Sequence, residues 1–298
     1  MTLRKERKRL FTKGLQKPDS GSFRNKSILS LNRKVVLNTH RGVVVLIKLN
    51  QIYFKSKPKR SKKAEKGCRM KTYAIGDIHG AYKALIQCFK RSKFDYKKDR
   101  LIVMGDVCDG YPDVKQCIDE LLKIRHCDLV IGNHDMWALD WALRGDKPEI
   151  WTKQGGDRTM ASYNGGPMPQ AHIDFLKGGQ LWIECDEQVF VHGGFNLDVS
   201  LKSHSAQALV WDRTLLDMAW KKRISGRKCQ LGKYKDIFIG HTTTEVYRTL
   251  QPIHVCNIWN LDTGAGWSGK LTIMDVDTKE YWQSDLSLDL YSGVPNQL

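Results

Sequence analysis

The chain has 298 residues, with 49 Lys and Arg against 32 Asp and Glu and a formal net charge of +17. The charge is uneven, because residues 1–70 hold 21 basic and 3 acidic residues, which leaves 28 against 29 in residues 71–298. The near-neutral part therefore needs no nucleic-acid partner to explain its charge, and it is long enough for one large α/β domain. No apolar run near the start approaches the ~20 residues that span a bilayer. Lys and Arg also interrupt these runs, which argues against a signal peptide.

Residues 1–69 form a basic leader with a dense cluster of charge at 55–69 and one candidate strand at 43–47. This acid-poor composition is compatible with an arm for nucleic acid or anionic lipid, or with a transit peptide. We favour a disordered tail, or a reading frame that begins too far upstream, because Met70 directly precedes the first expected strand. The domain is then expected to cover residues 70–298, and we expect neither a membrane nor a nucleic-acid partner, except for nucleic acid that the basic leader could bind.

The eight cysteines include no CxxC pair and no tightly spaced framework. Scattered thiols in a chain of this size are typical of a reducing compartment. We therefore expect a cytoplasmic protein.

The first half of the domain alternates strands and helices. Apolar runs predict strands at 73–75, 101–104 and 127–131, and apolar spacings of three and four residues predict helices at 82–89 and 112–122. This order is typical of a βαβαβ unit with parallel strands. A further helix is expected at 134–145, and short helices with glycine-rich breaks at 151–163 and 169–177.

The second half is richer in strands, and we expect a mixed or antiparallel sheet there. One long helix is predicted at 206–222. The expected strands are 181–185, 188–191, 236–239, 254–261, 270–275 and 280–284.

Five of the apolar runs end at residue types that bind metals, and a glycine directly precedes four of these ends. Ligands of open α/β sheets collect at the C-terminal ends of the strands, and glycine allows a sharp turn and a close approach to a bound ion. The polar residues at these ends are Asp77 and His79, Asp106 and Asp109, Asn133 and His134, His192, and His241.

Asp, His and Asn without cysteine favour a hard or borderline divalent ion over a thiolate zinc site. A carboxylate can bridge two ions, and two ions about 3.5–4 Å apart can hold both the attacking and the leaving oxygen of a phosphoryl group. Such a centre also lowers the pKa of bound water toward ~7, which supplies a hydroxide nucleophile. Phosphoester hydrolysis is the reaction that uses these parts best. Two Mn²⁺ ions are expected, and iron or zinc also suits the ligands.

The motifs Gly76-Asp77-Ile78-His79-Gly80, Gly105-Asp106-Val107-Cys108-Asp109-Gly110, Gly132-Asn133-His134-Asp135, His192-Gly193-Gly194 and Gly240-His241-Thr242 stand in this order along the chain. Over residues 71–276 the chain resembles the calcineurin-like metallophosphoesterases, in the phosphoprotein phosphatase branch of the bacterial and bacteriophage lambda type. The resemblance implies an α/β sandwich of mixed β-sheets flanked by helices, with the site at the strand C-terminal ends. It also implies a serine/threonine protein phosphatase that acts on phosphorylated protein or a small phosphoester.

The resemblance further implies a role for each matching residue. Asp77 and His79 would bind one metal, Asn133, His192 and His241 the other, and Asp106 would bridge them. His134 would be the general acid, oriented by Asp109. Arg213 would bind the substrate phosphate, because the transition state also needs cationic donors.

One position departs from the family pattern. Gly110 stands where the family usually has an arginine that grips the substrate phosphate, and no lysine or hydroxyl reproduces that bidentate contact. We expect hydrolysis to survive, because the metal ligands remain, while the affinity and the choice of substrate stay open. Arg158 is a speculative replacement, although a solvated helix residue is the simpler interpretation. Trp137, Trp141, Trp151 and Trp211 are expected to pack in the core or the insertion, and Trp151 and Trp211 could also line the pocket.

Two alternatives stay open. A symmetrical dinucleoside tetraphosphatase shares the scaffold and often has aspartate at the end of the asparagine motif, as Asp135 is here. A nucleic-acid-associated protein that uses the basic leader would have a vestigial site, but all six expected metal ligands are intact.

Overall fold

The computed structural model describes residues 70–224 and 229–294. The leader, with its candidate strand at 43–47, lies outside the described residues, so the domain boundary at residue 70 stays a prediction. Among the helices of the described segments, none is both long and apolar enough to cross a membrane.

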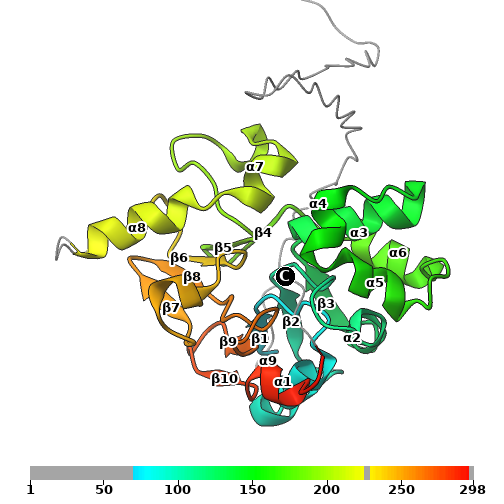
Figure 1. Cartoon of the computed structure of the whole chain (residues 1–298). Helices are drawn as coiled ribbons and strands as arrows, with labels where there is room; N and C mark the ends of the chain where they lie inside the picture. The colour runs from blue at the N-terminus through cyan, green and yellow to red at the C-terminus, as the bar shows by residue number, and fades with distance from the viewer. Residues whose placement is uncertain (1–69, 225–228, 295–298) are drawn as a thin grey trace, which may run out of the picture. The chain divides into compact units, whose positions relative to one another are not determined.

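The first sheet has five strands in the order β10-β9-β1-β2-β3 (Figure 1). The three strands of the predicted βαβαβ unit are parallel, and β9 pairs antiparallel with β1 on its other side. The strands are β1 (Thr72–Ile75), β2 (Arg100–Val103), β3 (His126–Leu129), β9 (Thr272–Asp275) and β10 (Tyr281–Gln283).

The second sheet has the order β4-β5-β6-β8-β7 and is mixed, as expected. β5, β6 and β8 are parallel, while β4 and β7 are antiparallel edge strands. Its strands are β4 (Trp182–Cys185), β5 (Gln188–Val191), β6 (Asp236–Ile239), β7 (Ile253–Val255) and β8 (Ile258–Asn260).

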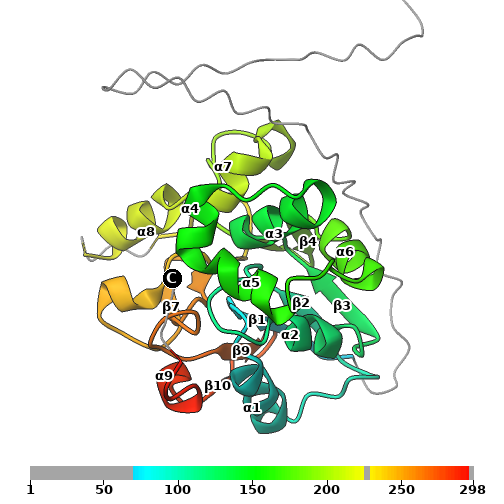
Figure 2. The same ribbon diagram turned by 45° about the vertical axis from the view of Figure 1, so that its right-hand side comes forward.

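Helices lie on the outer side of each sheet (Figures 1 and 2). Beside the first sheet are α1 (Tyr82–Ser92), α2 (Val114–Leu121), α3 (Asn133–Arg144), α4 (Glu149–Trp151), the kinked segment η1 (Thr152–Gly156), α5 (Asp157–Ser162), α6 (Gln170–Lys177) and α9 (Ser287–Leu290). Beside the second sheet are α7 (Ala206–Trp211), α8 (Thr214–Ile224) and the short 3₁₀-helices η2 (Leu201–Ser203) and η3 (Thr244–Tyr247).

The sheets face each other across a shared apolar layer. Because side chains alternate along a strand, Ala74 points into this layer while Tyr73 and Ile75 point to the helices. Phe190 and Phe238 of the second sheet stack in the layer with 4.6 Å between ring centroids. The predicted α/β sandwich of mixed sheets is therefore confirmed, and it brings the strand C-terminal ends of both sheets together.

Two predicted elements are divided. The helix expected at 206–222 breaks at Asp212, whose carboxylate accepts the backbone N–H groups of Thr214 and Leu215 at the start of α8. Aspartate favours this capping position over a helix interior. The strand expected at 254–261 is instead the β7–β8 hairpin, which turns at Cys256, a residue with a φ of 56°.

Two of the eight scattered cysteines are paired in the structure. Cys229 and Cys256 form a disulfide with 4.9 Å between their Cα atoms. The β7–β8 turn brings Cys256 to the segment after α8, a proximity that a spacing of 27 residues does not reveal. The eight cysteines together therefore do not indicate a reducing compartment, and a cytoplasmic location stays a prediction.

Candidate active site

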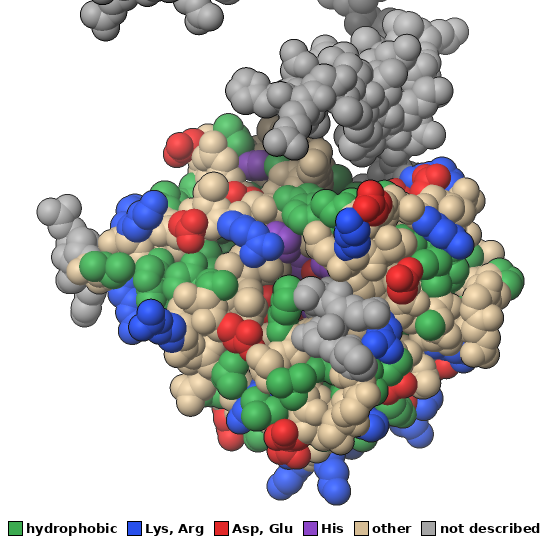
Figure 3. All heavy atoms as spheres, in the orientation of Figure 1, with side chains coloured by type: hydrophobic (Ala, Val, Ile, Leu, Met, Phe, Trp, Pro, Cys, Tyr) green, Lys and Arg blue, Asp and Glu red, His purple; other side chains and the backbone are tan. Residues whose placement is uncertain are grey.

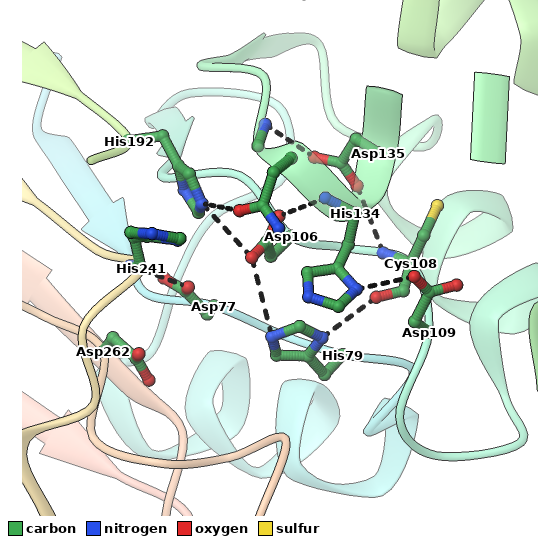
Figure 4. A network of polar contacts seen from close by, with 12 residues as sticks. Asp77, His79, Asp106, Cys108, Asp109, His134, Asp135, His192, His241 and Asp262 are labelled. Atoms are coloured by element: carbon green, nitrogen blue, oxygen red, sulfur yellow. Dashed lines mark hydrogen bonds and ion pairs between the residues drawn. The ribbon is translucent and has the colours of Figure 1, made fainter. Parts of the chain in front are cut away.

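The polar residues predicted at the strand ends converge on one centre between the two sheets (Figure 4). Asp77 and His79 follow β1, Asp106 follows β2, and Asn133 begins α3 after β3. His192 and His241 reach the centre from the second sheet, after β5 and β6. Figure 3 shows histidine side chains near the middle of the face that Figure 1 presents, with a basic side chain beside them.

Four residues at these strand ends have strained backbone. His79, Asp106, Asp109 and His241 have φ angles of 47°, 49°, 70° and 64°. Residues with a Cβ avoid this region, and each such residue costs about 1–3 kcal/mol, so the surrounding structure must hold them there. Part of the support is the carbonyl of Asp106, which accepts the backbone N–H groups of Ile78 and His79 at 3.0 and 2.8 Å.

A glycine directly precedes the polar residue at four of the strand ends, and its main effect is to let other groups approach the backbone closely rather than to allow a sharp turn. Of the four, only Gly105 has a positive φ, of 99°. A Cβ on Gly132 would lie 2.0 Å from Asp106 Oδ1, and one on Gly240 would lie 2.1 Å from Asp77 Oδ1. Any larger residue at these positions would push a central carboxylate out of place.

Asp106 is the shared member of two groups of potential metal ligands. Among the described residues, His79, Asp106 and His134 form one group and Asp106, His192 and His241 the other, with ligand atoms within 4.8 Å of one another in each group. Asp106 Oδ2 lies 3.2 Å from His192 Nε2, and its Oδ1 accepts the backbone N–H of His134 at 3.0 Å. The arrangement fits a bridging carboxylate.

Several atoms of the centre are suited to hold cations. His79 and His192 each donate Nδ1–H to a backbone carbonyl, at 3.0 and 2.7 Å, which turns Nε2 of each ring toward Asp106 at the centre. Asp77 Oδ1 and His241 Nε2 are buried without a hydrogen-bond partner among the described residues. Because buried polar atoms are normally satisfied, the donor set fits divalent metal ions.

Electrostatics favour the same interpretation. Burial lowers the pKa of His79 to about 3 and that of His241 to about 2, so both rings are neutral, as metal ligands must be. Burial also acts to lower the pKa of His192, but the carboxylates of Asp106 and Asp77 outweigh it and raise the pKa to about 10. In the protein alone, a proton on His192 balances the central carboxylates, and a metal would take over this role.

Asp77 faces a second carboxylate that the sequence analysis did not identify. Burial first, and then the charge of Asp262, raise the pKa of Asp77 well above its usual value. Burial likewise raises the pKa of Asp262 to about 6. Asp262 follows β8, and Figure 4 shows it beside Asp77. Its place after the apolar run of β8 matches the signal of the other strand ends, because the strand expected at 254–261 ends directly before it.

His134 pairs with Asp109 as the resemblance implied. Nδ1 of His134 lies 2.6 Å from Asp109 Oδ2, which directs Nε2 to the centre. Burial acts to lower the pKa of His134, but Asp106 and Asp109 outweigh it, and the pKa is raised. A protonated imidazole at this place can serve as an acid.

Asp135 has a structural role that the sequence analysis missed. Its two carboxylate oxygens accept the backbone N–H groups of Val107, Cys108 and Gly132 at 2.8, 3.1 and 3.1 Å. The side chain thereby ties the loop that carries Asp106 to the start of α3. The only available signal was its position at the third residue of a helix, where an acid commonly reaches back to the N-cap.

Arg213 lies at the break between α7 and α8 and reaches the second-sheet side of the centre. Its Nη1 donates to the carbonyl oxygen of His241 at 3.3 Å and to Thr242 Oγ1 at 3.2 Å. The exposed guanidinium has further N–H donors to offer a phosphate. The break in the predicted helix is what places it there.

The place of the absent arginine is covered by backbone. Gly110 has a φ of 76°, and Gly155 of the kinked segment η1 packs against it so closely that a Cβ on Gly155 would lie 2.5 Å from the Gly110 nitrogen. Arg158 lies in the same insertion and is partly exposed. Its role as a replacement stays a prediction.

The tryptophans divide between core and rim. Trp151 is fully buried, and Trp141 packs against it. Trp211 is 37% exposed and stands edge-on to His241, with 5.5 Å between ring centroids. Trp137 fills the space between Trp211 and His134, at 5.3 and 5.2 Å. One wall of the site is therefore aromatic.

The fold and the centre define a metallophosphoesterase. Residues 70–281 match the family model described as calcineurin-like phosphoesterase, and the chain belongs to this family. It is a metal-dependent phosphoric ester hydrolase.

Two relatives illustrate the range within the family. The chain is 26% identical to serine/threonine-protein phosphatase 1 of Salmonella typhimurium over 211 residues, which cover 67% of this chain and 89% of that protein. It is 40% identical to a symmetrical bis(5'-nucleosyl)-tetraphosphatase of Buchnera aphidicola over 269 residues, which cover 72% of this chain and 97% of that protein. A solved structure of a candidate diadenosine tetraphosphatase superimposes with a TM-score of 0.56 at 16% identity, covers 72% of this chain and 92% of its own, and shows the shared fold.

Proposed function

We propose that the chain is a serine/threonine protein phosphatase that uses two divalent metal ions, with Mn²⁺ as the expected metal. The observation that carries the proposal is Asp106, which both groups of potential ligands share. Asp77 and His79 would hold one ion, and Asn133, His192 and His241 the other.

The bound ions would polarise the phosphoryl group and activate a water molecule as nucleophile. The protein supplies the remaining functions. Arg213 offers guanidinium N–H groups to the phosphate from the second-sheet side. His134 donates the proton from Nε2 to the leaving oxygen, and Asp109 keeps the imidazole oriented through Nδ1.

The second candidate is a symmetrical dinucleoside tetraphosphatase. The relative of that name is matched over 97% of its length. The exposed Trp211 beside the centre favours a substrate with a planar base, because an indole can stack on it.

A substrate panel tests both candidates. Protein loaded with Mn²⁺ is assayed on p-nitrophenyl phosphate, phosphoserine and phosphothreonine peptides, and diadenosine tetraphosphate, with Asp106→Asn as the inactive control. A higher kcat/KM on the phosphopeptides supports the protein phosphatase. A higher kcat/KM on diadenosine tetraphosphate, lowered by Trp211→Ala, supports the second candidate, and no turnover of any of these substrates contradicts both.

A further inference from the structure

Asp109 is held from two sides by residues of the insertion after α3. Trp151 donates its indole N–H to Asp109 Oδ2 at 2.8 Å. Thr159 donates its hydroxyl to Asp109 Oδ1 at 2.6 Å and accepts the backbone N–H of Asp109 at 2.9 Å. Asp109, Trp151 and Thr159 are all completely buried.

These contacts hold the carboxylate of Asp109 through both of its oxygens. One oxygen is held by Thr159, and the other by Trp151 and by His134 Nδ1 at 2.6 Å. The imidazole of His134 is oriented through that second oxygen. A shift of the carboxylate would therefore move the ring that faces the centre, and small misplacements of reacting groups can cost about 100-fold in rate.

The backbone conformation of the insertion places the Trp151 indole and the Thr159 hydroxyl beside Asp109. The segment Thr152–Gly156 kinks the chain between Trp151 and Asp157, the first residue of α5, because its backbone is non-helical at Gln154 and at Gly155, where φ is 90°. Gly155 packs on Gly110, the residue after Asp109, and a Cβ on Gly156 would lie 2.5 Å from the Trp151 indole. Trp151 at the end of α4 and Thr159 in α5 therefore reach Asp109 from the two helices that this kink joins.

We propose that Trp151 and Thr159 are positioning residues that hold Asp109 so that His134 can protonate the leaving group. This role rests on the proposed function. In the step concerned, water oxygen bonds to phosphorus while the bond from phosphorus to the leaving oxygen breaks. The bonding electron pair stays on the leaving oxygen, which takes the proton of His134, and the proton lost by the water passes to solvent.

The role has a signature that loss of folding would not give. p-Nitrophenolate is a stable anion and leaves with little help from an acid, whereas phenolate and the alkoxide of serine need a proton. Weakened orientation of His134 should therefore slow phenyl phosphate and a phosphoserine peptide much more than p-nitrophenyl phosphate.

The test compares kcat on these three substrates for Mn²⁺-loaded full-length Trp151→Phe, Thr159→Val and Thr159→Ser. We expect the first two variants to lose about tenfold on phenyl phosphate and the phosphoserine peptide, and about twofold or less on p-nitrophenyl phosphate. Thr159→Ser keeps the hydroxyl and should restore the wild-type ratio. Trp141→Phe is the matched control, because it alters the same aromatic cluster and leaves the Trp151 indole N–H in place.

A double-mutant cycle shows whether the effect passes through Asp109. Trp151→Phe added to Asp109→Asn should cause no further loss on phenyl phosphate. Equal losses on all three substrates, full additivity, or failure of Thr159→Ser to restore the ratio would each overturn the positioning role while the proposed function stands. A wild-type protein without activity on any of the three would overturn both.

Discussion

The two sides of the site differ in how far the protein alone completes them. On the acid side, His134, Asp109, Trp151 and Thr159 form a closed set of hydrogen bonds. The ion side consists of the expected metal ligands and the neighbouring carboxylate, namely Asp77, His79, Asp106, Asn133, His192, His241 and Asp262. Two of its atoms, Asp77 Oδ1 and His241 Nε2, are buried without a partner among the described residues. The hydrogen bonds of the acid side are therefore complete without a ligand, whereas the unpartnered atoms of the ion side gain partners only when cations bind.

The largest effect should come from the residue on which the ion side is centred. Asp106→Asn removes the shared charge with little change in volume, and kcat/KM should fall by about 10³-fold or more, the scale for losing a preorganised electrostatic group. Metal analysis should show fewer ions per chain. Asp109→Asn changes a buried carboxylate on the acid side and should keep its metal. Loss of metal in this variant would show that the acid side also contributes to metal binding.

The next effect concerns the acid itself. His134→Gln should lower kcat on a phosphoserine peptide by about 10²–10⁴-fold, as expected for loss of general acid catalysis, and leave the metal content unchanged. His172→Gln is the matched control, because His172 is also buried beside a carboxylate, at 2.9 Å from Asp119, but outside the site. A drop in bound metal in His134→Gln would instead make His134 a ligand, as its grouping with His79 and Asp106 allows.

Arg213 should matter less, because the ions also bind the phosphate. Hydrogen bonds to charged groups contribute about 1.5–3 kcal/mol, so Arg213→Ala should lower kcat/KM by about 10–100-fold. Arg223→Ala removes an arginine from the other end of α8, where it lies over Trp220, and should behave like the wild type. Steady-state kinetics in which the two variants are alike would remove Arg213 from the phosphate site.

Metal binding should also be visible in stability. An ion at 100 times its Kd adds about 2.7 kcal/mol to the free energy of unfolding, which for a domain of this size raises the melting temperature by about 5–10 °C. Differential scanning calorimetry of chelator-treated protein, with and without Mn²⁺, measures the shift. Asp106→Asn should show little of it, and a wild type without a shift would mean that the ion side needs no cation.

The smallest effect is expected outside both sides. Removal of residues 1–69 should leave kcat/KM and melting temperature unchanged, because every site residue described here belongs to residues 77–262. Kinetics of the shortened and full-length chains provide the comparison. A collapse of activity would show that the basic leader contributes to catalysis.

The ion side was the part of the molecule most readily predicted from the sequence. Each of its residues follows an apolar run, and the geometry of parallel strands brings such ends together, so Asp77, Asp106 and His241 could be identified one by one. Asp262 carries the same signal, since the strand expected at 254–261 ends directly before it, but it lies outside the five motifs and was not selected.

The supporting contacts of the acid side could not be predicted in the same way. Trp151 and Thr159 lie 42 and 50 residues after Asp109 and carry no periodic signal. The break at Asp212 and the Cys229–Cys256 disulfide likewise depend on local capping and on tertiary proximity. Helical periodicity and cysteine spacing report neither of these.

The pairing of β1 with β9 has a consequence for folding. Tyr73 near the start of the domain lies opposite Asp275 near its end, so the strand that carries Asp77 has an unpaired edge until β9 has been synthesised. Contacts so distant in sequence form late and slowly. A nascent chain should therefore acquire hydrolytic activity only after its last strands leave the ribosome, which would keep an incomplete phosphatase from acting on cellular phosphoesters.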